Sequence, residues 1–375
     1  MTRVPHCSDI IVIGAGIIGC SVAYELVRRG ASVQLVDERT VGMGATQASA
    51  GILAPYIEAH ENSPLFDLAV RSLNLFDEFI GRVSSDSGVA IAYRRTGTLD
   101  VATDEVGRRT LRATADVLAR RGIGAEFLDG AAARREEPHV TGDVVAGLLI
   151  TAHGFVAANH LAHAVAVAAQ RGGAQLLDQR RVRRIGRVNG DIVVETDRGS
   201  LEGHAVVLAA GSWSGSIAID GVSARVPVRP VRGQLVYLVW NGSPLRRIVW
   251  SPRCYLVPWD DGTVLVGATI EEVGFDERVT VAGVRGLLEA ACEITPHALG
   301  AGFAGARVGL RPCTSDALPL IGASHVVPNL VYATGHYRNG VLLAPLTARL
   351  VADAMLDHRV DPALAAVSPS RFGDL

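Results

Sequence analysis

The sequence predicts an α/β protein in which a domain with a parallel sheet is interleaved with an α+β domain built on an antiparallel sheet. Three observations carry this prediction. A glycine-rich turn joins a short apolar strand to a helix near the N-terminus. Strand-like segments follow one another without helices in the middle of the chain, and another glycine turn precedes an apolar helix near the C-terminus. Strands that alternate with helices form parallel sheets, whereas consecutive strands pair in antiparallel order.

The N-terminal segment reads as strand, turn, helix and strand. Residues 9–13 are apolar and β-branched, and the turn GAGIIG occupies residues 14–19. Apolar residues then recur at helical spacing up to Gly30. The second strand, residues 32–36, ends directly before an acidic residue. This order of elements is typical of a dinucleotide-binding unit.

The residue types in this unit fit the chemistry of a dinucleotide. Gly14 permits the tight turn, Gly16 lets the backbone approach a pyrophosphate, and Gly19 lets helix and strand pack closely. The helix N-terminus offers N–H groups to the phosphates. Asp37 is placed to accept both protons of a ribose diol, which disfavours NADP. The alternative is a strand–helix turn that binds nothing.

A second GxGxxG pattern, GAGFAG, occupies residues 300–305. It follows a segment that contains proline, leads into a strand-like run and has no suitable acid downstream. We therefore predict that this copy is a loop without a dinucleotide.

The remaining elements follow from periodicity and from start signals. Ser63 and Pro64 are typical of a helix start. Helices are predicted over residues 64–83, 104–121, 159–171, 280–294 and 340–356. Strands are predicted over residues 97–102, 192–196, 205–209, 234–240, 254–258, 264–266, 304–310 and 330–333.

Composition excludes several classes of function. The net charge is −2, so the chain has no excess of positive charge to attract nucleic acid or an anionic membrane. The chain contains no lysine, which excludes a Schiff-base lysine, a phosphate-loop lysine and a lysine general base. No stretch reaches the roughly 18 apolar residues that a membrane-spanning helix needs. The five cysteines form no CxxC pair, so we expect no metal site and a reducing, cytoplasmic location: Cys7, Cys20, Cys254, Cys292 and Cys313.

Three glycine turns favour FAD over NAD as the dinucleotide. After Asp37, residues 42–55 are mostly small, which suits an extended segment beside a large flat cofactor. A second turn of small residues follows a strand at 208–215, and a third precedes the C-terminal helix at 333–340. One long cofactor that crosses several strand ends explains all three turns, whereas a simple NAD dehydrogenase does not need the last two.

These motifs resemble the D-amino-acid oxidase superfamily of flavoproteins, most closely its glycine oxidase branch of thiazole (thiamine) biosynthesis. The resemblance covers nearly the whole chain. It is carried by IVIGAGIIG at 11–19, GILAP at 51–55, GSWS at 211–214, PVRGQ at 230–234, CYLVP at 254–258, VGAT at 266–269, GLRP at 309–312 with Asp316, and GHYRNGVLLAP at 335–345. The last three together are far more specific than the first alone.

The resemblance implies FAD bound without a covalent link. It also implies an interleaved division, with residues 1–90, 142–222 and 303–375 holding FAD and residues 91–141 and 223–302 holding the substrate. The cofactor-binding residues that it implies are Gly14, Gly16, Ile17, Ile18, Gly19, Asp37, Glu38, Ala45, Thr46, Ala50, Gly51, Ile52, Val182, Gly211, His336, Tyr337, Asn339, Gly340, Val341 and Leu342.

By the same resemblance, Arg311 and Arg338 hold the substrate carboxylate and Tyr255 lies beside it. The planar guanidinium suits a carboxylate in an apolar pocket because it donates two parallel hydrogen bonds. Each residue has an alternative. Arg311 would tie the two domains by a salt bridge, Arg338 would pair with a flavin phosphate, and Tyr255 would be a core aromatic. The histidines are expected to be packing or surface residues rather than catalysts: His153, His160, His163 and His336.

Some residues depart from the family's pattern. Cys313 stands where the glycine oxidase branch usually has glycine, so it would either crowd the pocket or be buried. The cysteine that tethers flavin in the sarcosine oxidase branch aligns with Gly309, and that branch also uses a lysine that this chain lacks. The ribose acid, often Glu in the family, is Asp37 here.

The resemblance implies oxidation of glycine, sarcosine or small D-amino acids to the imine or 2-oxo acid, with O2 reduced to H2O2. It also suggests a homo-oligomer. The alternatives are a D-amino-acid dehydrogenase that uses another electron acceptor, and a non-catalytic FAD-binding subunit of a larger complex. We find no obvious acid–base pair, and none is required if the amine binds unprotonated and hydride passes directly to the flavin.

Overall fold

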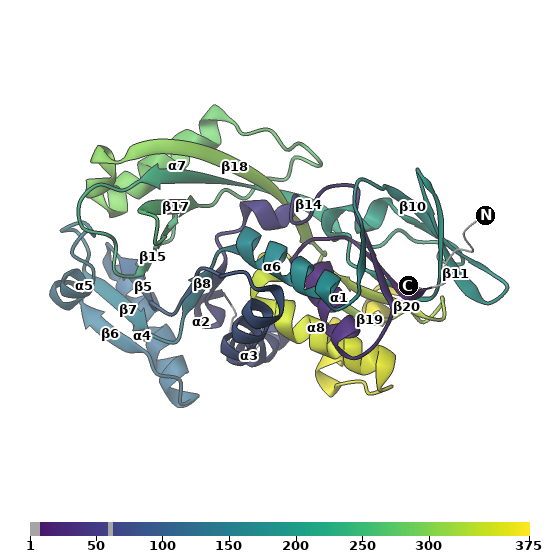
Figure 1. The fold of residues 1–375 in the computed structure, drawn as a ribbon. Helices are drawn as coiled ribbons and strands as arrows, with labels where there is room; N and C mark the ends of the chain where they lie inside the picture. Colours follow the sequence, from purple (N-terminus) through teal and green to yellow (C-terminus); the bar gives the residue numbers. More distant parts are fainter. Residues whose placement is uncertain (1–7, 59–62) are drawn as a thin grey trace.

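The computed structural model describes residues 8–58 and 63–375, and it contains every helix that the sequence predicts (Figure 1). The helices are α1 (Ile17–Arg28), α2 (Pro55–Glu58), α3 (Pro64–Ser87), α4 (Glu105–Arg120), α5 (Gly130–Glu136), α6 (Ala158–Arg171), α7 (Val281–Ile294) and α8 (Gly340–Leu356). The 3₁₀ helices are η1 (Ala45–Ala48), η2 (Gly211–Ser216), η3 (Pro296–Gly300), η4 (Pro362–Val367) and η5 (Pro369–Phe372). Cys7 lies outside the described residues.

A nine-stranded sheet contains the N- and C-terminal strands. Its strands are β1 (Ser8–Ile13), β2 (Val33–Val36), β9 (Gln175–Leu177), β10 (Val182–Val188), β11 (Asp191–Thr196), β12 (Gly199–Leu208), β13 (Ala218–Ile219), β19 (Leu320–Ala323) and β20 (Leu330–Thr334). β1 pairs in parallel with β12 and β2, and β12 pairs in parallel with β20. The parallel pairing predicted for the terminal strands is therefore confirmed, but the sheet is mixed, because β10 with β11, β11 with β12 and β19 with β20 pair antiparallel.

Helices α1, α3, α6 and α8 pack against one another beside this sheet (Figure 1). Residues 17–27 of α1 are all buried, because the helix contacts both α6 and α8. α3 begins as predicted, with the Ser63 hydroxyl accepting a hydrogen bond from the Leu65 N–H at 3.2 Å. It ends at Gly88, which has φ +65°. The buried α1 brings its N-terminus to the carboxyl end of β1.

The second large sheet has eight strands and is antiparallel except for one pair, as the sequence predicts for the middle of the chain. Its strands are β5 (Thr98–Ala102), β6 (Glu126–Asp129), β7 (Ala146–Ile150), β14 (Arg229–Val239), β15 (Ile248–Trp250), β16 (Tyr255–Pro258), β17 (Thr263–Gly267) and β18 (Gly302–Cys313). A small third sheet joins β3 (Ile52–Leu53), β8 (Gly154–Val156) and β4 (Tyr93–Arg94).

The pairing of β14 with β18 runs along nearly the whole length of both strands, and α7 lies over it (Figure 1). The expected division assigns residues 142–222 and 303–375 to the cofactor domain. Strands β7 and β18 nevertheless form hydrogen bonds within the eight-stranded sheet. Both segments therefore pair with the other sheet, and the division into two domains itself stays a prediction.

The second GxGxxG copy is not the loop that we expected. Gly300 ends η3, and residues 302–305 are the first residues of β18. Gly302 pairs with Val239, and Gly305, at φ +144°, pairs with Tyr237 beside a β-bulge. Glycine accommodates such bulges, so these glycines serve a strand irregularity.

Among the described residues, no helix combines the length and the apolar character that crossing a membrane requires. The described cysteines carry free thiols, and this part of the chain contains no group of three or more His, Cys, Asp or Glu that would hold a metal.

Candidate active site

A cavity of about 650 Å³ lies where the carboxyl ends of β1, β2, β12 and β20 meet the eight-stranded sheet. This is the edge at which open α/β sheets bind ligands. Within the described chain, every predicted site residue lines the cavity except Gly19. Three glycine turns that are far apart in the sequence thus meet in one cavity.

The first turn is shaped by close backbone packing. Gly14 has φ +108°, and a Cβ there would overlap the Ala209 carbonyl. A Cβ at Gly19 would overlap the Gly14 carbonyl, so Gly19 serves the packing of helix on turn. Among the described residues no side chain caps α1 at Gly16, although the Ile17 N–H donates to the Thr46 hydroxyl at 3.1 Å. Most of the helix N-terminus therefore remains available to an anion.

Asp37 lies at the end of β2 and faces the cavity. One carboxylate oxygen accepts a hydrogen bond from the Ala15 N–H at 2.5 Å, and the other accepts one from the Arg39 N–H at 2.7 Å. Burial raises the pKa of Asp37, and these two N–H groups oppose that shift. Each oxygen retains a further lone pair for a hydroxyl donor.

A wall of small residues borders the cavity beside η1. Gly51 has φ +64°, and a Cβ there would overlap the Val156 carbonyl. Gly309, where the sarcosine oxidase branch has its tethering cysteine, lies against η1, and a Cβ there would come within 2.8 Å of the Ala48 methyl. Cys313 is buried, its thiol donates to the Thr314 carbonyl at 3.2 Å, and burial raises its pKa. Cys313 therefore does not crowd this wall.

Arg311 extends from β18 into the cavity and lies over Gly233 of β14, where a Cβ would overlap its guanidinium. Its Nη1 donates to the carbonyls of Thr269 at 2.9 Å and Arg232 at 3.4 Å. Among the partners of Arg311 within residues 8–58 and 63–375 there is no carboxylate, so the structure gives no support to the alternative of a domain-tying salt bridge. The guanidinium thus retains N–H donors for an acceptor in the cavity.

Tyr255 and Arg338 line the same cavity from other elements. The Tyr255 ring lies over Gly267 of β17 and packs against Trp250, with ring centroids 5.1 Å apart. Arg338 lies in the turn before α8, with its guanidinium carbon 5.6 Å from the centre of the Tyr337 ring. Two guanidinium groups and one phenol thereby face one volume.

His336 lines the cavity but is buried, and burial lowers its pKa to about 3. Its Nε2 lies 3.1 Å from the Thr347 hydroxyl. The buried His153 packs against Tyr56, and burial lowers its pKa to about 3 as well. His160 and His163 are exposed on α6. These histidines are packing or surface residues, as the sequence predicts, and His336 is neutral at pH 7.

The sequence prediction missed several lining residues, among them Arg39, Trp213, Trp250, Arg253 and Ile270. The Arg39 guanidinium lies 4.5 Å from the centre of a Trp213 ring and pairs with Glu277 at 2.7 Å. Arg39 follows Asp37 by two residues, and this spacing could have indicated that Arg39 lies at the cavity. Glu277 comes from a loop 238 positions away, and nothing local in the sequence points to it.

Comparison with known proteins shows which family the chain belongs to. The family model described as FAD dependent oxidoreductase matches residues 9–354. The chain is 34% identical to the bifunctional protein ThiO/ThiG of Nostoc over 97% of this chain and 55% of the relative. It is also 34% identical to glycine oxidase of Geobacillus kaustophilus, over 93% of each chain. The chain thus spans about half the length of the ThiO/ThiG relatives.

A solved structure shares the fold throughout. The crystal structure of glycine oxidase from Geobacillus kaustophilus superposes with a TM-score of 0.93 at 33% identity. The superposition covers 98% of this chain and 99% of that one. The mixed α/β architecture with parallel and antiparallel pairing that the sequence predicts is therefore confirmed.

Proposed function

The chain belongs to the FAD dependent oxidoreductase family, and from this premise we propose that it is a glycine oxidase. The reaction is oxidation of glycine, sarcosine or small D-amino acids to the imine or 2-oxo acid, with O2 reduced to H2O2. One observation carries the proposal: Arg311, Arg338 and Tyr255 line the same cavity as the dinucleotide turn. Relatives named glycine oxidase, similar over most of their length, support it.

The residues present fit FAD. The cavity volume of about 650 Å³ lies in the range of cofactor sites. The uncapped start of α1 suits the pyrophosphate, and Asp37 suits the ribose diol. Among the described residues no side chain caps α8, whose first residues line the cavity. With FAD bound, this positive helix end would help to stabilise negative charge on the reduced flavin.

Arg311 and Arg338 are the groups to bind the substrate carboxylate. Both guanidinium groups keep their charge at any working pH. Tyr255 adds a phenol that can donate a third hydrogen bond. A carboxylate fixed in this way leaves the amine-bearing carbon one bond away, so the clamp orients the carbon that is oxidised.

FAD supplies the two-electron acceptor of the reaction. The protein's part is orientation, exclusion of water and electrostatics. Burial lowers the pKa of His336 to about 3, which makes this imidazole a weak base at pH 7. We expect the amine to lose its proton to solvent before it reacts, which predicts activity that rises with pH toward the amine's own pKa.

The biological setting rests on the resemblance. We propose a role in thiazole (thiamine) biosynthesis, which the similarity to ThiO/ThiG proteins supports. A cytoplasmic location and a homo-oligomer belong to the same proposal.

Anaerobic titration of the purified holoprotein tests the function. We expect glycine to bleach the flavin absorbance, and admission of air to restore it with one H2O2 per glycine. Bleaching by D-alanine or D-proline but not by glycine would shift the substrate class. Bleaching without reoxidation by air would favour the dehydrogenase alternative. If no small amino acid bleaches the flavin and no peroxide forms, the proposal is contradicted.

A second prediction concerns retention of the cofactor. The loop of Phe275 and Glu277 reaches the Asp37 end of the cavity, where Glu277 pairs with Arg39 and Phe275 packs against Trp213. The pair is about one-third exposed, so its contribution is modest. We expect Glu277→Gln to raise the dissociation constant of FAD about threefold, measured by the fluorescence of released flavin.

Glu272→Gln is the matched control for this measurement. Glu272 lies on the same loop and pairs with the exposed Arg229, away from the cavity. Equal effects of the two substitutions, or none at Glu277, would contradict the role of the Arg39 pair.

A further inference from the structure

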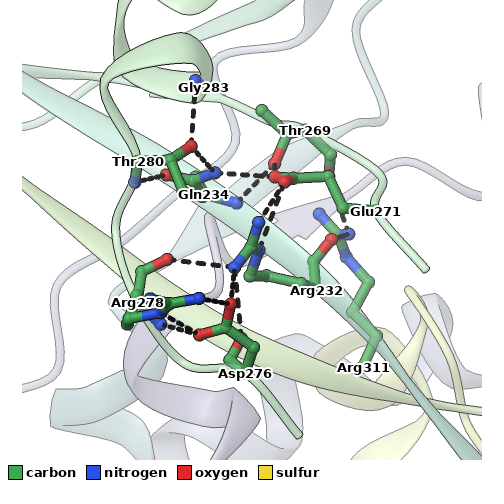
Figure 2. A network of polar contacts seen from close by, with 9 residues as sticks. All are labelled: Arg232, Gln234, Thr269, Glu271, Asp276, Arg278, Thr280, Gly283 and Arg311. Atoms are coloured by element: carbon green, nitrogen blue, oxygen red, sulfur yellow. Dashed lines mark hydrogen bonds and ion pairs between the residues drawn. The ribbon is translucent and has the colours of Figure 1, made fainter. Parts of the chain in front are cut away.

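Arg232 is a buried charge on the face of β14 opposite Arg311. Only 4% of the residue is exposed. Its guanidinium pairs with Glu271 at 2.5 Å and with Asp276 at 2.9 Å, and it donates to the carbonyls of Asp276 and Arg278 (Figure 2). One side chain thus ties together both ends of the segment 271–278.

Glu271 is the centre of this network. Its other oxygen accepts hydrogen bonds from the Gln234 amide at 2.7 Å and from the Thr269 hydroxyl at 2.5 Å (Figure 2). Although burial alone would raise it, hydrogen bonds from Arg232, Thr269 and Gln234 lower the pKa of Glu271. The carboxylate is therefore charged and held by several donors.

The network reaches Arg311 through the backbone. The main-chain N–H and C=O groups of Arg232 and Glu271 form a two-way bridge, at 2.9 and 3.0 Å. The Gln234 N–H donates to the Thr269 hydroxyl at 2.9 Å, which fixes Thr269 against β14. The Thr269 carbonyl then accepts the 2.9 Å hydrogen bond from Arg311 (Figure 2). The acceptors that orient Arg311 are thus the carbonyl of Arg232 itself and that of Thr269, which lies two residues before Glu271 and donates its hydroxyl to the Glu271 carboxylate.

A contribution to the stability of the fold does not account for this cluster of charged groups. Buried ion pairs often contribute no more than well-packed apolar residues of similar volume, although removal of one partner is costly. Networks of this kind do fix a single geometry of the segments that they join. Here the network also holds Thr269, whose carbonyl is an acceptor for Arg311 in the cavity.

We propose that Arg232 is a positioning residue for carboxylate recognition. It holds Glu271 and Asp276, which fixes the Thr269 carbonyl and thereby the guanidinium of Arg311. This inference rests on the proposed function, because it assumes that Arg311 binds a substrate carboxylate. A lysine at 232 would keep a charge but would not reach both acids and the two carbonyls at once.

The test measures carboxylate binding apart from turnover. Acetate, which has a carboxylate and no amine, is titrated into the holoprotein and followed by the flavin absorbance. We expect Arg232→Lys to raise the dissociation constant of acetate and the KM for glycine about tenfold, while kcat stays within about threefold and FAD content is unchanged. Glu271→Gln, which preserves shape, is expected to act in the same direction, and it replaces Arg232→Lys if that variant fails to fold.

Two comparisons separate positioning from a merely structural role. Arg278→Lys is the matched control, because Arg278 pairs with the same Asp276 but its side chain is 84% exposed; we expect it to leave acetate binding unchanged. In an Arg311→Ala background, Arg232→Lys should weaken acetate binding no further. The proposal would be overturned if the dissociation constant of acetate were unchanged in folded Arg232→Lys and Glu271→Gln. It would also be overturned if Arg232→Lys weakened acetate binding tenfold in the Arg311→Ala background as well. If the variants weaken acetate binding as expected but the protein does not oxidise glycine, the proposed function is rejected and the positioning role of Arg232 stands.

Discussion

Replacement of Arg311 by alanine is expected to raise the KM for glycine about 100-fold, with a smaller effect on kcat. The side chain lines the cavity, and hydrogen bonds to two carbonyls hold its Nη1. A 100-fold change corresponds to about 2.7 kcal/mol, and the loss of one charge-assisted hydrogen bond, about 1.5–3 kcal/mol, is enough to account for it. Steady-state kinetics and anaerobic reduction of the flavin measure the two effects. Arg338→Ala should give the same pattern, because both guanidinium groups face one volume.

The control for this prediction is Arg307→Ala. Arg307 lies on the same strand and face as Arg311, but its guanidinium contacts Tyr237 and the Gln47 carbonyl and does not line the cavity. Its KM should match that of the unchanged protein. A normal KM in Arg311→Ala, with FAD bound, would reject the role of Arg311 in binding the carboxylate.

Substitution of Gly51 by alanine is expected to cost about 3 kcal/mol of stability and much of the bound FAD. Two effects add at this position. A positive φ of 64° is unfavourable for alanine, and its Cβ would overlap the Val156 carbonyl. The segment that would have to move lines the cavity beside η1. Thermal unfolding should show a melting temperature lower by roughly 5 °C, and the ratio of flavin to protein absorbance should fall.

Gly81→Ala provides the comparison. Gly81 lies within α3 at an exposed position with open space around it, so alanine should stabilise the helix by about 0.5–1 kcal/mol. Equal stability of the Gly51 and Gly81 variants would contradict the close approach of backbone at Gly51.

Local patterns predicted most of the fold. The helices over 159–171 and 340–356 have strong apolar periodicity and are present as α6 and α8. Helix α3 extends four residues beyond its predicted end, to Ser87 directly before the glycine at 88, because the serines near its end carry no apolar signal. The strand β18 begins at Gly302, inside a glycine pattern read as a loop, because its pairing with β14 is set by a distant partner.

The site was predictable where it rests on motifs. The glycine turns, Asp37 and the two arginines are marked by sequence patterns, and all of them lie at one cavity. Arg232 and Glu271 were not predicted as a unit, because their pairing depends on the fold of the 269–280 segment onto β14. Spacing along the chain carries no signal for such a contact.

Two glycines described above also limit how the substrate range of this protein can diverge. Arg311 lies over Gly233 and Tyr255 over Gly267, so any side chain at either glycine would displace a group that lines the cavity. Substitution of either glycine is therefore a poor route to a cavity of another size. Adaptation to another amino acid has to proceed through other lining positions, such as Arg253 and Ile270, which leave the two arginines and the phenol in place.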